Sequence, residues 1–255
     1  MPLMTDRVTQ TPVVLVTGAA RRIGAEIVRV FHENGYNVII HYRSSESDAR
    51  ALQQQLNQQR ADSAKLLQAD LNDPVQVISL ACDAVGCYGR VDALVNNASA
   101  FYATPVGSIT QAHWDALMNS NARAPLFLSQ ALAGNLRTAQ GSIVNLTDIN
   151  VERGMANFTP YTMAKAALMA MTRSLAQELA PEVRVNSVSP GAILWPEHNG
   201  DPQQQAEEQA RILAGIPAGK LGTERDIAET VYFIATSGSY MTGENIRVDG
   251  GRALA

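Results

Sequence analysis

The sequence contains little cysteine and no cluster of side chains that would hold a metal ion. Two cysteines, Cys82 and Cys87, occur in 255 residues, and the histidines are scattered along the chain. Disulfide frameworks and structural zinc sites need several Cys or His residues at short, regular spacings. We therefore expect free thiols and no metal site. Ordinary surface or strand-end positions are expected for four histidines: His32, His41, His113 and His198.

Long apolar runs and stretches of basic residues are also missing. No run approaches the about 18 apolar residues of a membrane span, and the first twelve residues lack the apolar centre of a secretory signal. The net charge is −4 without a basic cluster, whereas binding to nucleic acid needs clustered Lys and Arg. We expect a cytoplasmic protein with neither a membrane nor a nucleic acid as partner.

Short apolar, β-branched runs alternate with segments whose apolar residues recur at helical spacing. Strands are predicted at residues 13–17, 37–41, 64–69, 91–95, 142–147, 184–188 and 244–248, and helices at 22–33, 46–60, 74–85, 111–133, 159–180 and 225–235. This alternation predicts an α/β fold, a Rossmann-like doubly wound parallel sheet with helices on both faces.

One domain over residues 1–255 is predicted, because no Pro/Gly/Ser-rich linker divides the chain. The one irregular stretch, 193–216, is polar and carries Trp195. Long irregular segments in compact domains are often lids, so we expect it to cover a substrate that contacts Trp195. A solvated insertion is the alternative.

The turn after the first strand has the sequence TGAARRIG at residues 17–24. Small residues where a strand turns into a helix let backbone amides approach a pyrophosphate, which the helix dipole favours. We expect Gly18, Arg22, Ile23 and Gly24 to contact a dinucleotide. Arg22 occupies the place of a glycine that is often found in the related T-G-x-x-x-G-x-G pattern.

The end of the second strand indicates which dinucleotide binds. An NAD-preferring site carries an acidic side chain there, but the sequence from Tyr42 through Arg43 and Ser44 has no acid before Glu46. Arg43, Ser44 and Ser45 could together receive a 2′-phosphate, with a charge-assisted bond from the guanidinium, so the expected cofactor is NADP(H). At the end of the third strand, Asp70 and Leu71 are expected beside the adenine. The alternative for Asp70 is a helix N-cap.

Tyr161 and Lys165 stand four residues apart, hence on one face of a helix. A nearby ammonium favours the phenolate, so we expect a lowered tyrosine pKa and proton transfer near neutral pH. Taken alone, the pair also fits an ordinary exposed helical contact.

The set of motifs resembles the short-chain dehydrogenase/reductase family over essentially the whole chain. It comprises Asn96-Asn97-Ala98, Asn121, Tyr161 with Lys165, Pro190-Gly191, and TGENIRVDGG at residues 242–251. The resemblance implies that Tyr161 donates a proton, that Lys165 binds the nicotinamide ribose, and that Asn121 helps to hold a relay water. It also implies cofactor contacts from Asn97, Ala98, Ser99, Pro190 and Gly191, and a homotetramer.

One position departs from that family. The usual serine thirteen residues before the tyrosine is Asp148 here. A carboxylate would repel a developing alkoxide unless it were protonated or the substrate presented N–H donors. The departure selects against ordinary ketone reduction. Loss of function is the other reading, although Tyr161, Lys165 and Asn121 all remain.

Four local sequences resemble pteridine reductases, including the bacterial dihydromonapterin reductases: GAARRIG, NNASAFY, YTMAK and the TDxxVERG pattern at 147–154. The resemblance implies that Phe101 stacks on a pterin, which then lies between that ring and the nicotinamide. Arg22 and Ser99 would bond the pterin and the cofactor phosphate, while Asp148 and Tyr161 would face the reacting side.

The resulting hypothesis is NADPH-dependent reduction of a dihydropterin, of the dihydrobiopterin or dihydromonapterin type, to the tetrahydropterin. Hydride goes to a ring C=N, and the proton comes from Tyr161, from Asp148 or from water. Two alternatives stay open. One is a carbonyl reductase of the same fold that acts on a ketoacyl, sugar or quinone substrate. The other is a non-catalytic NADP(H)-binding sensor.

Overall fold

The computed structural model describes residues 11–195 and 202–254. Ten N-terminal residues, on which the argument against a secretory signal mostly rested, lie outside this range. So do His198 and the remainder of 196–201 within the expected lid. Among the described residues, none of the helices combines the length and the apolar character needed to cross a bilayer.

Seven parallel strands form one sheet in the order β3-β2-β1-β4-β5-β6-β7. The strands are β1 (Val13–Val16), β2 (Asn37–Tyr42), β3 (Ala64–Gln68), β4 (Ala93–Asn96), β5 (Ser142–Leu146), β6 (Arg184–Pro190) and β7 (Asn245–Val248). The order reverses between β1 and β4, which is where doubly wound sheets open a crevice for ligands at the carboxyl ends of their strands.

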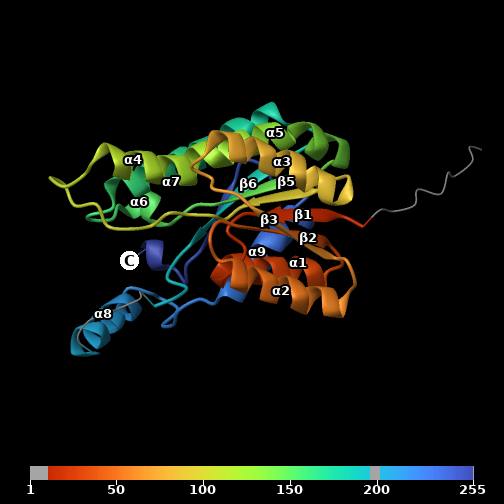
Figure 1. Ribbon diagram of the computed structural model, residues 1–255. Helices are drawn as coiled ribbons and strands as arrows, with labels where there is room; N and C mark the ends of the chain where they lie inside the picture. The colour runs from red at the N-terminus through yellow and green to blue at the C-terminus, as the bar shows by residue number, and fades with distance from the viewer. Residues whose placement is uncertain (1–10, 196–201, 255) are drawn as a thin grey trace, which may run out of the picture.

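Helices cover both faces of the sheet. They are α1 (Arg22–Glu33), α2 (Glu46–Gln59), α3 (Pro74–Tyr88), α4 (Gln111–Met118), α5 (Ala124–Ala139), α6 (Asn150–Arg153), α7 (Thr159–Glu178), α8 (Pro202–Ala214) and α9 (Glu224–Thr236). One layer holds α1, α2 and α9, and the other holds α3, α4, α5 and α7 (Figure 1). The predicted fold class is confirmed.

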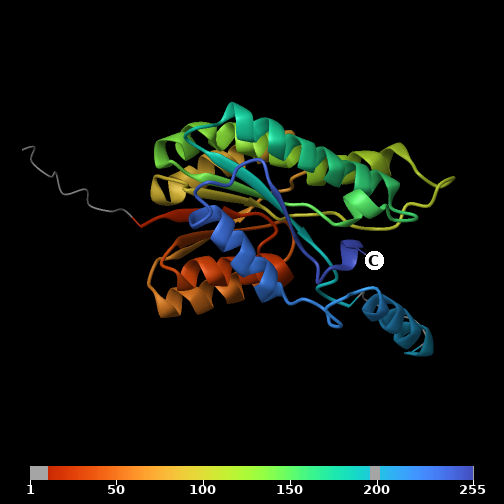
Figure 2. The same cartoon turned by 180° about the vertical axis from the view of Figure 1, so that it is seen from behind.

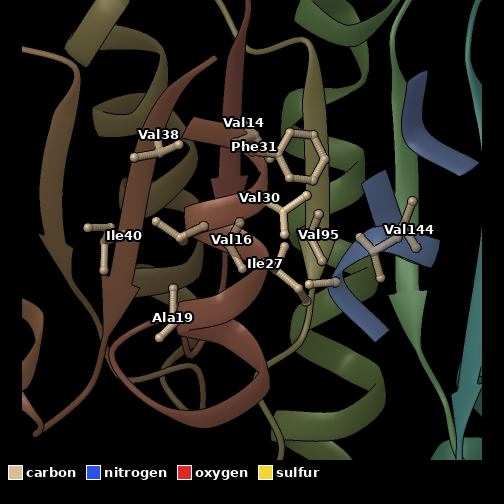
Figure 3. Close-up of a cluster of buried hydrophobic side chains, with 14 of the residues drawn as sticks. Val14, Val16, Ala19, Ile27, Val30, Phe31, Val38, Ile40, Val95 and Val144 are labelled. Carbon is tan, nitrogen blue, oxygen red and sulfur yellow. The ribbon is translucent and has the colours of Figure 1, made fainter. Parts of the chain in front are cut away.

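Two hydrophobic clusters, one on each face, hold these layers together. Successive residues of β1 alternate between them, Val14 and Val16 to one face and Val13 and Leu15 to the other, and all four are fully buried. Figure 3 shows strand side chains meeting those of α1, among them Val30 and Phe31. Burial on both faces explains why the strands read as continuous apolar runs.

The helix predicted at residues 111–133 is interrupted. A π-helical turn, Asn119–Arg123, separates α4 from α5. Pro125, the second residue of α5, has no amide N–H to donate to the carbonyl four residues earlier, which belongs to Asn121. Such turns often mark functional positions. Two short helical turns, α6 and Arg252–Leu254, had not been predicted.

The segment expected as a lid contains α8, which lies apart from both helix layers, near the C-terminus and the carboxyl ends of the strands (Figures 1 and 2).

Candidate active site

A cleft of about 890 Å³ opens at the carboxyl ends of the strands. The sequence-predicted residues that line it are Gly18, Arg22, Ile23, Gly24, Tyr42, Arg43, Ser44, Asp70, Leu71, Asn97, Ala98, Ser99, Phe101, Asp148, Tyr161, Lys165, Pro190, Gly191 and Trp195. Asn121 is fully buried behind the lining. Residues drawn from almost the whole chain therefore meet at one place.

The two glycines of the turn, Gly18 and Gly24, are packed too tightly to carry a side chain. Gly18 has φ +60°, and a Cβ on it would lie 2.8 Å from Ala98 Cα. A Cβ on Gly24 would lie 2.4 Å from the Gly18 carbonyl oxygen. No side chain caps the N-terminus of α1, and its first residues line the cleft. The backbone N–H groups at the start of α1 are therefore available to an anion such as a pyrophosphate.

Arg22 holds a backbone conformation that suits glycine. Its φ is +54°, in the left-handed region that costs an ordinary residue about 1–2 kcal/mol. This explains why the related pattern often has glycine at this position. This strained position places a guanidinium in the lining of the cleft.

Asn97 and Thr17 fasten the glycine turn to the end of β4. The Asn97 amide donates to the carbonyl oxygens of Thr17 (2.9 Å) and Gly18 (3.0 Å). The Thr17 hydroxyl accepts from the backbone N–H groups of Asn97 and Ala98, both at 3.0 Å. Asn97 thus orders the turn that we expect to hold the cofactor.

His41 supports the same turn from the other side, which sequence reasoning missed. It lies near the end of β2 as expected, but it is buried. Its Nδ1 accepts from the Gly18 N–H (3.0 Å), and its Nε2 donates to the Ala69 carbonyl (3.1 Å). Burial lowers its pKa to about 4, which keeps Nδ1 an acceptor at neutral pH. His32 is also buried and bonds Ser63.

Arg43 and Ser44 are exposed at the end of β2 and line the cleft. Within the described part of the chain, the Arg43 guanidinium makes no ion pair or hydrogen bond, whereas its backbone carbonyl accepts from Gln68. Asp70 is not the cap of α3, contrary to the alternative considered for it. Asp73 caps that helix by accepting from Val75 N, whereas Asp70 accepts from Asn72 N at 2.9 Å.

Tyr161 and Asp148 form a hydrogen-bonded pair in the lining of the cleft. The Tyr161 hydroxyl donates to Asp148 Oδ2 at 2.7 Å, and Asp148 Oδ1 accepts from Asn150 N at 2.7 Å. The expected lowering of the tyrosine pKa is wrong for this structure. Burial, and then the negative charge and the hydrogen bond of Asp148, raise the pKa of Tyr161 well above its ordinary value. Tyr161 therefore holds its proton at neutral pH.

Lys165 does not bond the tyrosine hydroxyl. Its ammonium donates to the Leu146 carbonyl at 2.7 Å and lies 5.9 Å from the centre of the Tyr161 ring. Burial lowers the pKa of Lys165 to about 8, although the Asp148 charge opposes that shift. The lysine is 3% exposed, so the ordinary exposed helical pair is excluded. It still lines the cleft, where its remaining N–H groups can meet a ribose.

Asn121 is engaged with the loop that follows β4. Its side-chain oxygen accepts from the Ser99 hydroxyl at 2.7 Å, and its Nδ2 donates to the carbonyls of Ala100 (3.0 Å) and Leu117 (2.9 Å). The buried amide thereby joins the π-helical turn to the start of the loop that carries Phe101.

Phe101 is 53% exposed and lines the cleft beside the tyrosine. Its ring meets the Tyr161 ring edge-on, with 4.8 Å between centroids. A flat ring system that enters the cleft would therefore find an aromatic face next to the Tyr161–Asp148 pair.

The cleft is also lined by residues that sequence reasoning did not name as its lining. Arg211 and Ile212 of α8 line it together with Trp195, and Arg252 enters from the C-terminal turn. Burial and the positive charge of Arg153 lower the pKa of Arg252, while the charge of Asp148 opposes this effect. The nearest sequence signal was the polar composition of 193–216.

Residues 18–253 match the family model described as Enoyl-(Acyl carrier protein) reductase. The chain belongs to the short-chain dehydrogenase/reductase family. It is 38% identical to pteridine reductase 1 of Leishmania tarentolae, covering 95% of this chain and 96% of the relative. It is also 32% identical to a 3-oxoacyl-(acyl-carrier-protein) reductase of Staphylococcus aureus, over 93% of this chain and 96% of that protein.

Among solved structures, a blue fluorescent protein from a metagenomic library in complex with NADPH is similar to this member of the family. It is 38% identical with a TM-score of 0.86, and the match covers 95% of this chain and 98% of that chain. Among the described residues, no group of three or more His, Cys, Asp or Glu side chains could hold a metal.

Proposed function

We propose that this oxidoreductase reduces a dihydropterin to the tetrahydropterin with NADPH. The observation that carries the proposal is Asp148, which stands where most of the family has serine and accepts the hydrogen bond of Tyr161 at 2.7 Å. An acceptor at this place suits a substrate that presents N–H groups, as a pterin does, better than a developing alkoxide. The similarity to pteridine reductase 1 supports the same substrate class.

NADP(H) is the cofactor expected from the sequence, and the similar structure in complex with NADPH supports it. The residues present fit this molecule. The tight glycine turn and the uncapped start of α1 suit the pyrophosphate, and Arg43 suits the 2′-phosphate. Lys165 suits the nicotinamide ribose. When bound, the cofactor supplies hydride for a ring C=N.

The other side chains would orient the substrate and supply the proton. Phe101 offers a stacking surface, and Arg22 and Ser99 offer polar contacts at its edge. Tyr161 keeps its proton because burial and Asp148 raise its pKa. We infer that the Tyr161–Asp148 pair delivers this proton to the ring nitrogen, with Asn150 N holding the carboxylate in place. The described part of the expected lid, which lines the cleft with Trp195, Arg211 and Ile212, would cover the bound ring.

A carbonyl reductase is the second candidate. It is favoured by the similarity to a 3-oxoacyl-(acyl-carrier-protein) reductase and by the Tyr161–Lys165 pair, which also suits ketone chemistry. Asp148 argues against it.

The homotetramer also stays a proposal. Leu126 and Phe127, exposed apolar residues of α5, would be buried in such an assembly. A cytoplasmic location stays an expectation from the sequence.

The proposal is tested by NADPH oxidation, with the reduced product identified by mass. Purified wild-type protein is given dihydrobiopterin, dihydromonapterin and a panel of ketoacyl, sugar and quinone substrates, each with NADPH and, at equal subsaturating concentration, with NADH. We expect turnover of a dihydropterin with preference for NADPH. Turnover of ketones alone would establish the second candidate. Cofactor binding without turnover of any substrate would indicate a sensor.

A further inference from the structure

The aromatic surface of the cleft lies on a segment without regular structure. Phe101 belongs to the loop between the end of β4 at Asn96 and the start of α4 at Gln111. Its side chain is half exposed. A ring on an irregular loop can orient a substrate only if other groups fix its position, because small misplacements of a bound substrate reduce the rate strongly.

The loop is attached at both sides of Phe101. On the N-terminal side, Asn121 bonds Ser99 and Ala100, as described above. On the C-terminal side, the Thr104 N–H donates to the Asn157 carbonyl at 2.6 Å, and Thr104 is 1% exposed. The second anchor belongs to the segment that leads directly into α7.

Between these anchors, Phe101 stacks on Phe158. The two ring centroids are 4.6 Å apart, and the ring planes differ by 17°. The cleft lining includes Phe101 but not Phe158. Phe158 is therefore placed to support the Phe101 ring without itself lining the cleft. Aromatic pairs of this kind contribute beyond the area that they bury.

The same segment also fixes the proton donor. Phe158 immediately precedes α7, and Tyr161 follows three residues later in the first turn of that helix. The Phe158 ring lies 6.5 Å from the Tyr161 ring at an interplanar angle of 78°. A shift of residues 157–158 would thus move the stacking surface relative to the Tyr161 hydroxyl.

We propose that Phe158 is a positioning residue, which holds Phe101 at a fixed place beside Tyr161 so that a flat heterocycle stacks within reach of the proton donor. The use of Phe101 by a pterin rests on the proposed function. The support of the loop by Phe158 does not.

The test compares Phe158→Ala, the conservative Phe158→Tyr, and Phe233→Ala as a control that removes a half-exposed phenylalanine from α9. For Phe158→Ala we expect the KM for the dihydropterin to rise about 3- to 10-fold, because one aromatic contact is lost. Its kcat should fall as well, by a similar factor, because a less firmly held ring places the substrate less often within reach of Tyr161. Its Kd for NADPH should stay within about twofold, because Phe158 does not line the cleft. Phe158→Tyr and the control should resemble wild type. An unchanged KM in folded Phe158→Ala would overturn the proposal.

Hydrogen–deuterium exchange separates this proposal from the proposed function. It is measured on the NADPH-bound proteins over residues 99–104, without substrate. We expect faster exchange in Phe158→Ala alone, which would support the positioning role even if the wild-type protein reduced no dihydropterin. Unchanged exchange there would overturn the role, whatever substrate the enzyme uses.

Discussion

Tyr161 donates its hydroxyl hydrogen bond to Asp148, with 2.7 Å between Oη and Oδ2. The pair is held on both sides, because Asn150 N bonds the other carboxylate oxygen and Tyr161 sits in the first turn of α7. Burial and the neighbouring charge raise the pKa of Tyr161 well above its ordinary value, so the tyrosine holds its proton at neutral pH. In the proposed function, this is the proton that would go to the ring nitrogen of the reduced C=N.

Replacing Tyr161 by Phe removes that proton and the hydrogen bond to Asp148 but keeps the aromatic ring. We expect kcat to fall on the order of 10²–10⁴, the usual contribution of a positioned acid. NADPH affinity, measured by titration calorimetry, should be nearly unchanged. Tyr240→Phe serves as the matched control, since Tyr240 is fully exposed. Turnover of Tyr161→Phe close to wild type would refute the acid role of the tyrosine.

The strained backbone of Arg22 is expected to lower the free energy of unfolding, while its guanidinium contributes to substrate binding. Both Arg22→Gly and Arg22→Ala remove the guanidinium, but only glycine relieves the strain of φ +54°. We expect the glycine variant to be more stable than the alanine variant by about 1 kcal/mol in urea unfolding, the reverse of the order inside an ordinary helix. Both variants should raise the KM for the dihydropterin. An alanine variant as stable as the glycine variant would contradict the strain.

His41 should make stability depend on pH below neutrality. The folded protein holds His41 neutral with a pKa of about 4, whereas the unfolded chain takes up a proton near pH 6.5. The unfolded state therefore binds more protons between these values, and the stabilisation present above pH 6.5 is lost as the pH falls towards 4.

The loss assigned to His41 is on the order of 3 kcal/mol. Urea unfolding of wild type and His41→Gln at several pH values measures it as the difference between the two profiles. Parallel profiles would show that His41 is not buried neutral.

Much of the cleft could be predicted from the sequence because its signals are local. The glycine turn, the strand-end position of Arg43 and the four-residue spacing of Tyr161 and Lys165 each depend on short stretches of chain. Their meeting at one edge follows from the parallel sheet, whose strands all end on that side. Asp148 and Tyr161, which stand thirteen residues apart in the sequence, are in direct contact in the structure.

The missed features depend on packing between distant segments. The tyrosine pKa was mispredicted because burial and the charge of Asp148, thirteen residues away, raise it, while Lys165 bonds Leu146 and not the phenol. His41 looked ordinary because its bonds to Gly18 and Ala69, 23 and 28 residues away, form only in the folded chain. Phe158 gave no signal, since an aromatic residue before a helix has no partner until Phe101 folds back onto it.

In the proposed function Asp148 selects a ring C=N over a C=O, and the most direct test is Asp148→Ser. This variant restores the hydroxyl that is usual in the family. The measurement is the ratio of kcat/KM for the dihydropterin to kcat/KM for the best ketone of the panel, in wild type and variant, with NADPH affinity as the control for folding. We predict that wild type strongly favours the dihydropterin and that the variant lowers the ratio by on the order of 10². An unchanged ratio in a variant that still binds NADPH would contradict the account.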